Sequence, residues 1–123
     1  MSQDPFGSPH WPLELRLKQA ERVLEIEFDD GAKFRLPAEY LRVESPSAEV
    51  QGHHPDQKQL VAGRAAVGIQ RLEPVGHYGV RVVFDDGHDT GIFSWRYLYE
   101  LGTEQDERWR RYLAALAAKG LSR

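Results

Sequence analysis

Histidine is the only side chain that titrates near neutral pH, and one of the five in this chain lies among acidic residues. His88 directly follows the turn glycine Gly87, with Asp86 and Asp89 close by. A neighbouring carboxylate raises the basicity of an imidazole, so His88 is a candidate metal ligand or general base. A solvent-exposed turn residue would have the same spacing, and we prefer that interpretation.

A second histidine pattern lies at His54-Pro55-Asp56, which reads H-x-D. This order occurs in the 2-His-1-carboxylate sites of iron oxygenases. Such a site would also need a distal histidine and a jelly-roll barrel of roughly 8 strands. The hydrophobic alternation of this chain predicts about six strands, so an exposed loop histidine is the favoured interpretation.

Two carboxylate pairs, Asp29-Asp30 and Asp85-Asp86, could form acid/base dyads. Each pair precedes a glycine between two apolar runs, where aspartate is favoured because it hydrogen-bonds its own backbone. We therefore predict two hairpin turns at these positions and no dyad.

Four aromatic residues follow the second turn: Phe93, Trp95, Tyr97 and Tyr99. Trp95 and Tyr99 are four residues apart and share one face of a helix. Burial in the core is one interpretation, and we prefer it. The other is an exposed patch for a protein partner, since aromatic residues are enriched at interface hot spots.

Composition excludes several classes of protein. The chain has 123 residues, no cysteine and a net charge of -3 with interspersed signs. These features argue against a disulfide framework, a thiolate metal site and the basic face of a nucleic-acid-binding domain. No apolar run approaches the ~20 residues of a membrane span, and no signal peptide is evident. Phosphate-loop and nucleophile-elbow motifs are also absent, and we expect a cytoplasmic protein.

Hydrophobic periodicity predicts strands over residues 13–18, 22–28, 33–36, 67–72, 79–84 and 89–93, and helices over 38–42, 95–101 and 105–119. Pro37 suits a first helical position. Ser94 is expected to cap one helix, Gly102 to end it and Thr103 to cap the next. Residues 1–12 are predicted to form a disordered leader, and residues 44–63 a long polar loop.

The chain repeats one pattern: strand, Phe-Asp-Asp-Gly turn, strand, short helix. Phe28 corresponds to Phe84, and Tyr40-Leu41 corresponds to Tyr97-Leu98. We predict an α+β fold in which two similar antiparallel hairpin/short-helix halves form one small sheet, followed by a C-terminal amphipathic helix. One stripe of this helix is predicted to pack on the sheet, and it contains Trp109, Tyr112, Leu113 and Leu116. Residues 13–120 would form a single domain.

Residues 13–102, and above all the stretch from Phe84 to Leu98 with its D-G-H…W-x-x-L motif, resemble the N-terminal domain of gamma-butyrobetaine hydroxylase. The same domain is found in small stand-alone bacterial proteins and at one end of some Mrp-type iron–sulfur assembly ATPases. The resemblance implies a small α+β domain. It does not imply hydroxylase activity, because the iron and 2-oxoglutarate residues of the hydroxylase belong to a second domain.

The resemblance also implies a zinc module with three cysteines after the first short helix and a histidine after the second turn. His88 matches that histidine, whereas Ser45, Ser47 and Val50 stand at the cysteine positions. Serine is a poor zinc ligand beside a thiolate, and valine is none. We therefore expect no zinc and no other cofactor.

These observations favour a non-enzymatic accessory or protein-interaction domain, with an iron–sulfur assembly protein or another metalloprotein as partner. The expected surface contains His88, Trp95 and Tyr99. An alternative is a metal-binding module centred on His88, with further ligands from Glu44, Glu49, His53 or His54. A small carnitine-type hydroxylase is a third possibility.

Overall fold

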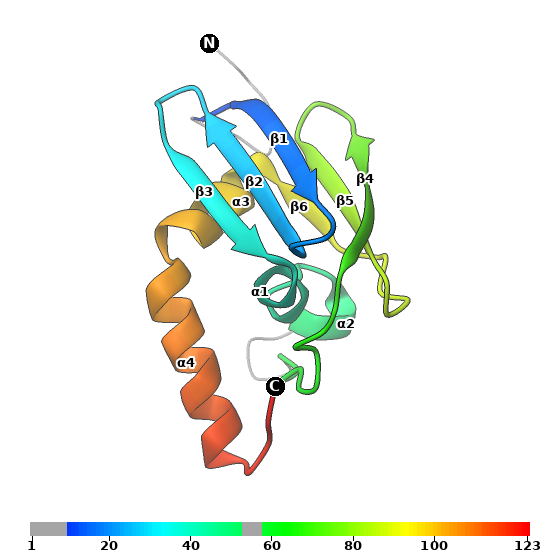
Figure 1. Cartoon of the computed structure of the whole chain (residues 1–123), viewed down its shortest axis with the longest axis vertical. Helices are drawn as coiled ribbons and strands as arrows, with labels where there is room; N and C mark the ends of the chain where they lie inside the picture. Colours follow the sequence, from blue (N-terminus) through cyan, green and yellow to red (C-terminus); the bar gives the residue numbers. More distant parts are fainter. Residues whose placement is uncertain (1–9, 53–57) are drawn as a thin grey trace.

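The structure is a computed structural model that describes residues 10–52 and 58–123. Along the chain the elements are β1 (Pro12–Lys18), β2 (Val23–Phe28), β3 (Lys33–Pro37), α1 (Ala38–Val43), α2 (Ala48–Gln51), β4 (Ile69–Val75), β5 (Gly79–Phe84), β6 (Ile92–Ser94), α3 (Trp95–Thr103) and α4 (Gln105–Ala118). The predicted α+β class is confirmed. The strands form two antiparallel sheets, β1-β2-β3 and β4-β5-β6, where we had predicted one (Figure 1).

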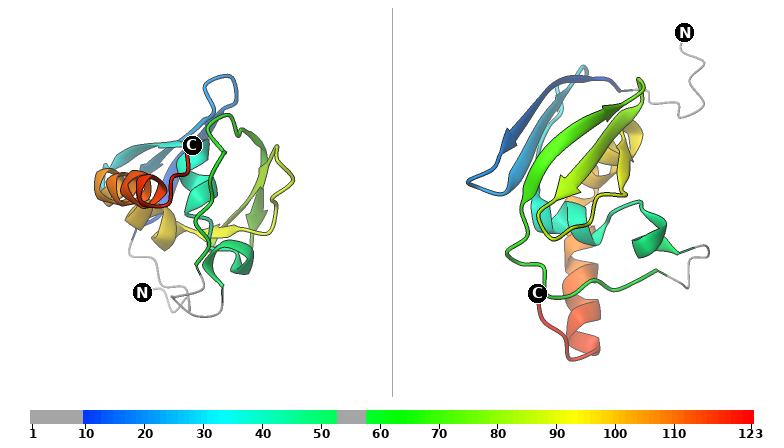
Figure 2. Two further views of the ribbon diagram at one scale, coloured as in Figure 1. Left: turned by 90° about the horizontal axis from the view of Figure 1, so that it is seen from below. Right: turned by 90° about the vertical axis from the view of Figure 1, so that its right-hand side faces the viewer.

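Each sheet has one apolar face, and the two faces contribute to the same core. In β2, Leu24, Ile26 and Phe28 are buried while the glutamates between them lie on the other face. Val80 and Val82 of β5 play the same part in the second sheet. α1 and α3 complete this core (Figure 2). Alternation alone predicts which face is apolar, but it does not predict whether two hairpins join edge to edge or share a core.

The two halves repeat in atomic detail at their turns. The Phe28 amide donates to the Ala32 carbonyl at 2.8 Å, and the Phe84 amide donates to the His88 carbonyl at 3.0 Å. His88 therefore occupies the place that Ala32 has in the first half. This correspondence supports the predicted repeat. It also shows that the two halves differ here in side chain, with alanine in the first half and histidine in the second.

The carboxylate pairs shape these turns, as predicted. The Oδ1 atom of Asp30 accepts from the amide two residues on at 3.0 Å, and that of Asp86 does the same at 3.1 Å. Gly31 and Gly87 follow with φ of 89° and 92°, in the left-handed region that favours glycine. In each turn, the Oδ1 atom of the second aspartate therefore accepts a hydrogen bond from a backbone amide.

Two tyrosines at equivalent positions connect the halves. The Tyr40 hydroxyl donates to the Leu101 carbonyl at 2.7 Å, and the Tyr97 hydroxyl donates to the Glu44 carbonyl at 2.5 Å. Each tyrosine thus binds the carbonyl four residues beyond the other tyrosine. Burial raises the pKa of Tyr97 to about 12, so its hydroxyl remains a donor at physiological pH.

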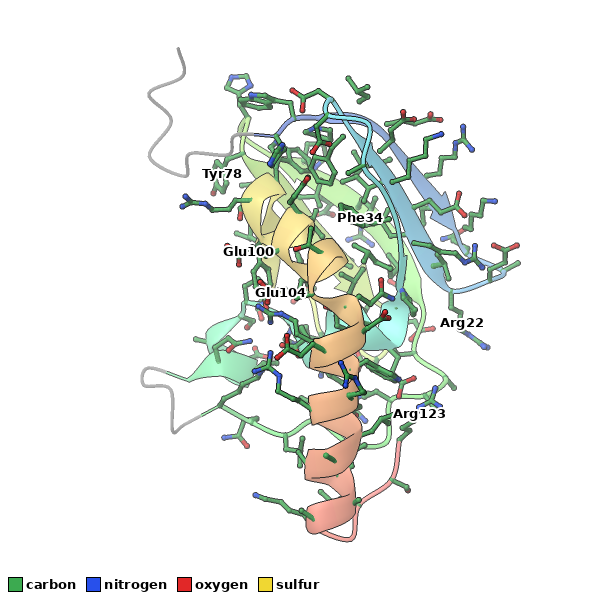
Figure 3. The ribbon with its side chains drawn as sticks, turned by 90° about the vertical axis from the view of Figure 1, so that its left-hand side faces the viewer. Arg22, Phe34, Tyr78, Glu100, Glu104 and Arg123 are labelled. Atoms are coloured by element: carbon green, nitrogen blue, oxygen red, sulfur yellow. The ribbon has the colours of Figure 1, made fainter. Side chains whose placement is uncertain are left out.

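The junction of α3 and α4 differs from the prediction. Ser94 caps α3 as expected, accepting from the Tyr97 amide at 3.0 Å. However, α3 continues through Gly102 to Thr103, and the side chain of Thr103 donates to the Glu100 carbonyl and does not cap α4. The glycine is needed because a Cβ there would overlap the ring of Phe34, which lies beside α3 (Figure 3).

Helix α4 packs on α1 and on the loop that precedes β4, whereas we predicted that it packs on a sheet. Tyr112 and Leu116 form a small cluster with Val43 and with residues 60–62. Leu113, which we placed on the same stripe, remains 39% exposed. The i, i+3, i+4 pattern correctly predicts an apolar face but does not identify its neighbour.

Smaller differences concern the segment ends. Residues 1–9 of the predicted leader lie outside the described residues, whereas Pro12 already begins β1. Pro37 precedes α1 as its N-cap, and Pro74 belongs to β4. The predicted 44–63 loop contains α2, and residues 53–57 lie outside the described part, including His53 and His54-Pro55-Asp56.

Candidate functional site

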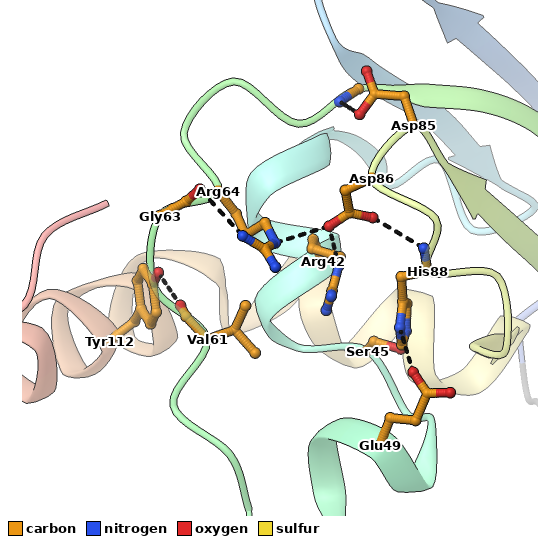
Figure 4. Close-up of polar contacts among 11 residues, drawn as sticks. Arg42, Ser45, Glu49, Val61, Gly63, Arg64, Asp85, Asp86, His88 and Tyr112 are labelled. Atoms are coloured by element: carbon orange, nitrogen blue, oxygen red, sulfur yellow. Dashed lines mark hydrogen bonds and ion pairs between the residues drawn. The ribbon is translucent and has the colours of Figure 1, made fainter.

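The His88 side chain lies inside the protein, between the second turn and the segment that follows α1 (Figure 4). Only 5% of the residue is exposed, so the preferred interpretation of a solvent-exposed turn residue is wrong. The turn sets the backbone of His88, and residues 45–49 then cover its ring. Sequence spacing could not reveal this cover, because it comes from about 40 residues upstream.

Both nitrogens of the His88 imidazole are hydrogen-bonded. Nδ1 lies 3.1 Å from Oε2 of Glu49, and Nε2 lies 2.9 Å from Oγ of Ser45. An ionised carboxylate only accepts hydrogen bonds, so Nδ1 donates to Glu49 and Nε2 accepts from the Ser45 hydroxyl. The Ser45 oxygen in turn accepts from the Ser47 amide at 3.3 Å. We call Ser45, Glu49 and His88 the His88 cluster.

Burial and charge favour the neutral form of this imidazole. Burial lowers the pKa of His88, and the nearby Arg42 guanidinium lowers it further. Glu49 and Asp86 act in the opposite direction without reversing the shift. His88 is therefore a neutral, hydrogen-bonded side chain at physiological pH.

Two arginines hold the turn that carries His88. Nε of Arg42 donates to Oδ2 of Asp86 at 2.8 Å, and Nε of Arg64 forms an ion pair with the same oxygen at 2.8 Å. Burial alone would raise the pKa of Asp86, but hydrogen bonds from the His88 amide and Arg42 lower it overall. Asp86 thus serves as an ionised anchor for α1 and for the segment before β4.

The positions that correspond to the zinc cysteines have separate structural functions. Ser47 caps α2 by accepting from the Glu49 amide at 3.2 Å, and its hydroxyl pairs with Thr90 at 2.6 Å. Val50 is 2% exposed and packs as an apolar residue. Ser45 is the member of this set that hydrogen-bonds His88.

The described residues around His88 do not fit a zinc ion. Ser45 and Glu49 bind opposite nitrogens of the ring, so they cannot both join His88 on one metal. The Glu44 carboxylate is bound by Lys58 at 2.9 Å and Arg108 at 3.2 Å. The Asp86 carboxylate is bound by Arg42 and Arg64. The hydroxyls of Ser47 and Thr90 bind zinc poorly compared with thiolates.

A second group of residues of the types that bind metals lies at the first turn, between β2 and β3. Ligand atoms of His10, Asp29 and Asp30 lie within 4.8 Å of one another, all near the surface. Asp29 accepts from the Trp11 amide at 3.2 Å, and Asp30 accepts from the Tyr99 hydroxyl at 2.5 Å. These bonds attach the start of β1 and α3 to the turn, which is a structural function.

Trp95 and Tyr99 are half-buried and pack against the core. The Trp95 indole donates to the His77 carbonyl at 2.8 Å, and the Tyr99 ring packs edge-on against Phe28 at 5.0 Å. Trp95 directly follows β6, whose last residue pairs with the first residue of β5. His88 comes after the last residue of β5, at the opposite end of that strand. The three residues of the expected interaction surface therefore do not form one site.

A cleft that was not predicted from the sequence lies between α4 and residues 58–61, and we call it the α4 cleft. Its volume is about 440 Å³. Arg108, Arg111, Tyr112 and Ala115 line one wall, and Lys58 and Leu60 lie opposite. The i, i+3, i+4, i+7 spacing of the α4 residues signals a shared helix face, but the opposite wall comes from a loop that periodicity does not describe.

The fold and the His88 cluster define a small two-sheet α+β domain whose turn histidine is fixed by hydrogen bonds. The family model described as gamma-butyrobetaine hydroxylase-like, N-terminal, matches residues 15–99. The chain belongs to this family, as its sequence motif indicated. A search of proteins with curated descriptions finds no match.

The solved structures that are similar to the chain include two NMR structures and one crystal structure. Two NMR solution structures are 47% and 46% identical, with TM-scores of 0.80 and 0.81; they cover 93% and 100% of this chain and 90% and 89% of their own. A crystal structure of a DUF971-family protein of unknown function from Acidithiobacillus ferrooxidans is 44% identical, with a TM-score of 0.63, and covers 74% of this chain and 91% of its own. Among the described residues, no helix is long and apolar enough to cross a membrane.

Proposed function

We propose that this protein is a non-enzymatic accessory domain that acts in the cytoplasm by binding a protein partner. The observation that carries the proposal is the bonding of His88. Its two ring nitrogens are bound to Ser45 and Glu49, and the side chain is 2% exposed. A general base or a metal ligand needs a nitrogen that can reach a substrate or an ion, whereas this imidazole fastens two segments of the fold.

The class of partner follows from the family resemblance. The domain resembles one that some Mrp-type iron–sulfur assembly ATPases carry at one end. An iron–sulfur assembly protein or another metalloprotein is therefore the partner class that we propose. The short chain would contribute a docking surface, and the metal chemistry would belong to the partner.

Affinity capture with the tagged full chain tests this function. Untagged chain added in excess provides the control, because it displaces a specific partner and leaves background proteins in place. We expect a competed protein that belongs to the proposed partner class. A capture in which excess untagged chain displaces nothing would contradict the proposed function.

Two further measurements separate this proposal from the alternatives. Incubation with 2-oxoglutarate, ferrous iron and gamma-butyrobetaine should give no turnover, and turnover would establish an enzyme. Titration with zinc or ferrous iron, followed by NMR of the histidine rings, should leave His88 unshifted. A His88 shift that saturates with added metal would favour the metal-binding module.

A further inference from the structure

We propose that the α4 cleft binds an acidic peptide segment of the partner, with carboxylates at its cationic rim and an apolar side chain in its floor. The inference rests on the proposed function and names the surface and the partner chemistry. Three properties of the cleft carry it: its position relative to the repeat, its charge and its apolar lining.

The cleft is built from the parts of the chain that the two halves do not share. The two halves correspond up to Glu44 and Leu101, the residues whose carbonyls accept the hydrogen bonds from Tyr97 and Tyr40. Beyond these residues one half continues into the 45–68 segment and the other into α4. These two additions form the opposite walls of the cleft. The duplicated core does not require such an arrangement.

The rim of the cleft is positively charged in a protein whose net charge is -3. Lys58 and Arg108 both pair with Oε1 of Glu44, at 2.9 Å and 3.2 Å. Glu44 is 8% exposed at its side chain and is the carboxylate among the cleft-lining residues. Arg108 has a second carboxylate partner in Glu104. These two cations are therefore balanced by Glu44 and Glu104, and the excess positive charge of the rim comes from Arg111.

Arg111 supplies a third cation, one turn of α4 beyond Arg108. In the described part of the chain Arg111 has no ion-pair partner, and it is exposed. Arg108 also pairs with Glu104, at the junction of α3 and α4. Arg111 is thus the cation that a ligand carboxylate can reach without displacing an internal ion pair.

The floor of the cleft is apolar. Val43 is buried at the end of α1, Leu60 and Val61 lie across from it, and Ala115 continues the α4 wall. The Tyr112 hydroxyl donates to the Val61 carbonyl at 2.5 Å, which fixes the loop against the helix. A peptide that places a leucine or phenylalanine here buries apolar area while its acidic neighbours meet the rim.

This chemistry selects a peptide over the other polyanions. Nucleic acid requires a long basic stripe that neutralises many phosphates, whereas this rim offers three cations within one cleft. A free small carboxylate would use the rim and leave the apolar floor uncovered. An acidic segment with an apolar anchor uses both features.

Peptide selection on the immobilised full chain tests the proposal directly. We expect displayed peptides that combine Asp or Glu with a large apolar residue to be enriched. Fluorescence anisotropy with an enriched peptide should show that Arg111→Glu weakens binding by roughly tenfold or more, about the effect of one reversed charge contact. Amide NMR shifts on peptide addition should concentrate at residues 58–61 and 108–115.

Arg110→Glu is the matched control, because Arg110 is exposed, neighbours Arg111 on α4 and does not line the cleft. It should leave peptide affinity unchanged, and circular dichroism should show both variants folded. The proposal is overturned if no acidic peptide is enriched, if both variants bind equally well, or if the shifts map elsewhere. A captured partner that binds Arg111→Glu as tightly as wild type would also overturn it, while leaving the accessory function in place.

Discussion

The Ser45 hydroxyl lies 2.9 Å from Nε2 of His88, although 43 positions separate the two residues along the chain. The bond joins the segment after α1 to the second turn, so it connects the two halves of the repeat. The resemblance to a zinc module implies a thiolate at position 45 and an imidazole at position 88. This chain has a buried hydrogen bond between the same two positions.

Replacement of Ser45 by alanine should destabilise the fold. The variant leaves Nε2 of His88 buried without its donor, and such an orphaned polar atom costs about 1–3 kcal/mol. Urea denaturation of wild type and Ser45→Ala measures the difference. Ser122→Ala, at an exposed position, is the control and should change the free energy of unfolding by less than about 0.5 kcal/mol. Equal stability of the Ser45 variant and wild type would show that the bond is not stabilising.

Stability should fall as the pH is lowered through the range in which His88 titrates. The folded-state pKa of His88 lies below its ordinary value of 6.5, so the unfolded chain takes up this proton first. The contribution of neutral His88 to the free energy of unfolding is complete above about pH 6.5. It is lost as the pH falls toward the lower folded-state pKa, with a slope of at most about 1.4 kcal/mol per pH unit.

His88→Gln removes this titration and provides the comparison. Its denaturation free energy should be flatter than that of wild type just below pH 6.5. The Asp86 carboxylate, whose pKa is also lowered, loses its contribution only below its ordinary value of 3.8. The two effects therefore fall in separate pH ranges. Parallel pH profiles for wild type and His88→Gln would contradict the assignment.

Gly102→Ala should destabilise the protein, against the usual preference of helices for alanine. In an open helix the change would favour folding by about 1 kcal/mol. Here the new Cβ would meet the Phe34 ring, and such overpacking typically costs about 1–3 kcal/mol. Thermal and urea denaturation measure the effect.

A double-mutant cycle with Phe34→Ala identifies the cause of that cost. Without the ring, Gly102→Ala should become neutral or stabilising, because the clash is removed and helix propensity remains. If Gly102→Ala is equally destabilising in both backgrounds, the glycine is required by something other than Phe34.

Local patterns were sufficient to predict most of the secondary structure. Alternating side chains predict β2 and β5, and the Ser94 cap and the Asp-Asp-Gly turns have local causes that act within a few residues. The repeat could also be predicted, because Tyr40 and Tyr97 follow the two turns at nearly the same distance, with a slip of one residue. Its reciprocal hydrogen bonds needed the structure.

The errors arise where distant segments meet. Gly102 looks like a helix end in sequence, and the ring of Phe34 explains why it lies inside one. His88 looks exposed because its covering residues, Ser45 and Glu49, come from another part of the chain. Matching positions 45, 47 and 50 to the implied cysteines was the available signal, because a shared zinc ion would place position 45 beside the histidine that His88 matches.

Restoring the cysteines should convert the His88 cluster into a zinc site. The triple variant Ser45→Cys, Ser47→Cys and Val50→Cys would give a three-thiolate, one-imidazole donor set, which is a common structural zinc composition. We expect about one zinc ion per chain, together with a rise in melting temperature when zinc is added, since a ligand that binds only the folded state stabilises it. Adding His88→Ala to the triple variant should weaken zinc binding, while the wild-type chain should bind none at this position. A triple variant that folds but shows neither bound zinc nor a zinc-dependent melting temperature would mean that positions 45, 47 and 50 do not converge on His88.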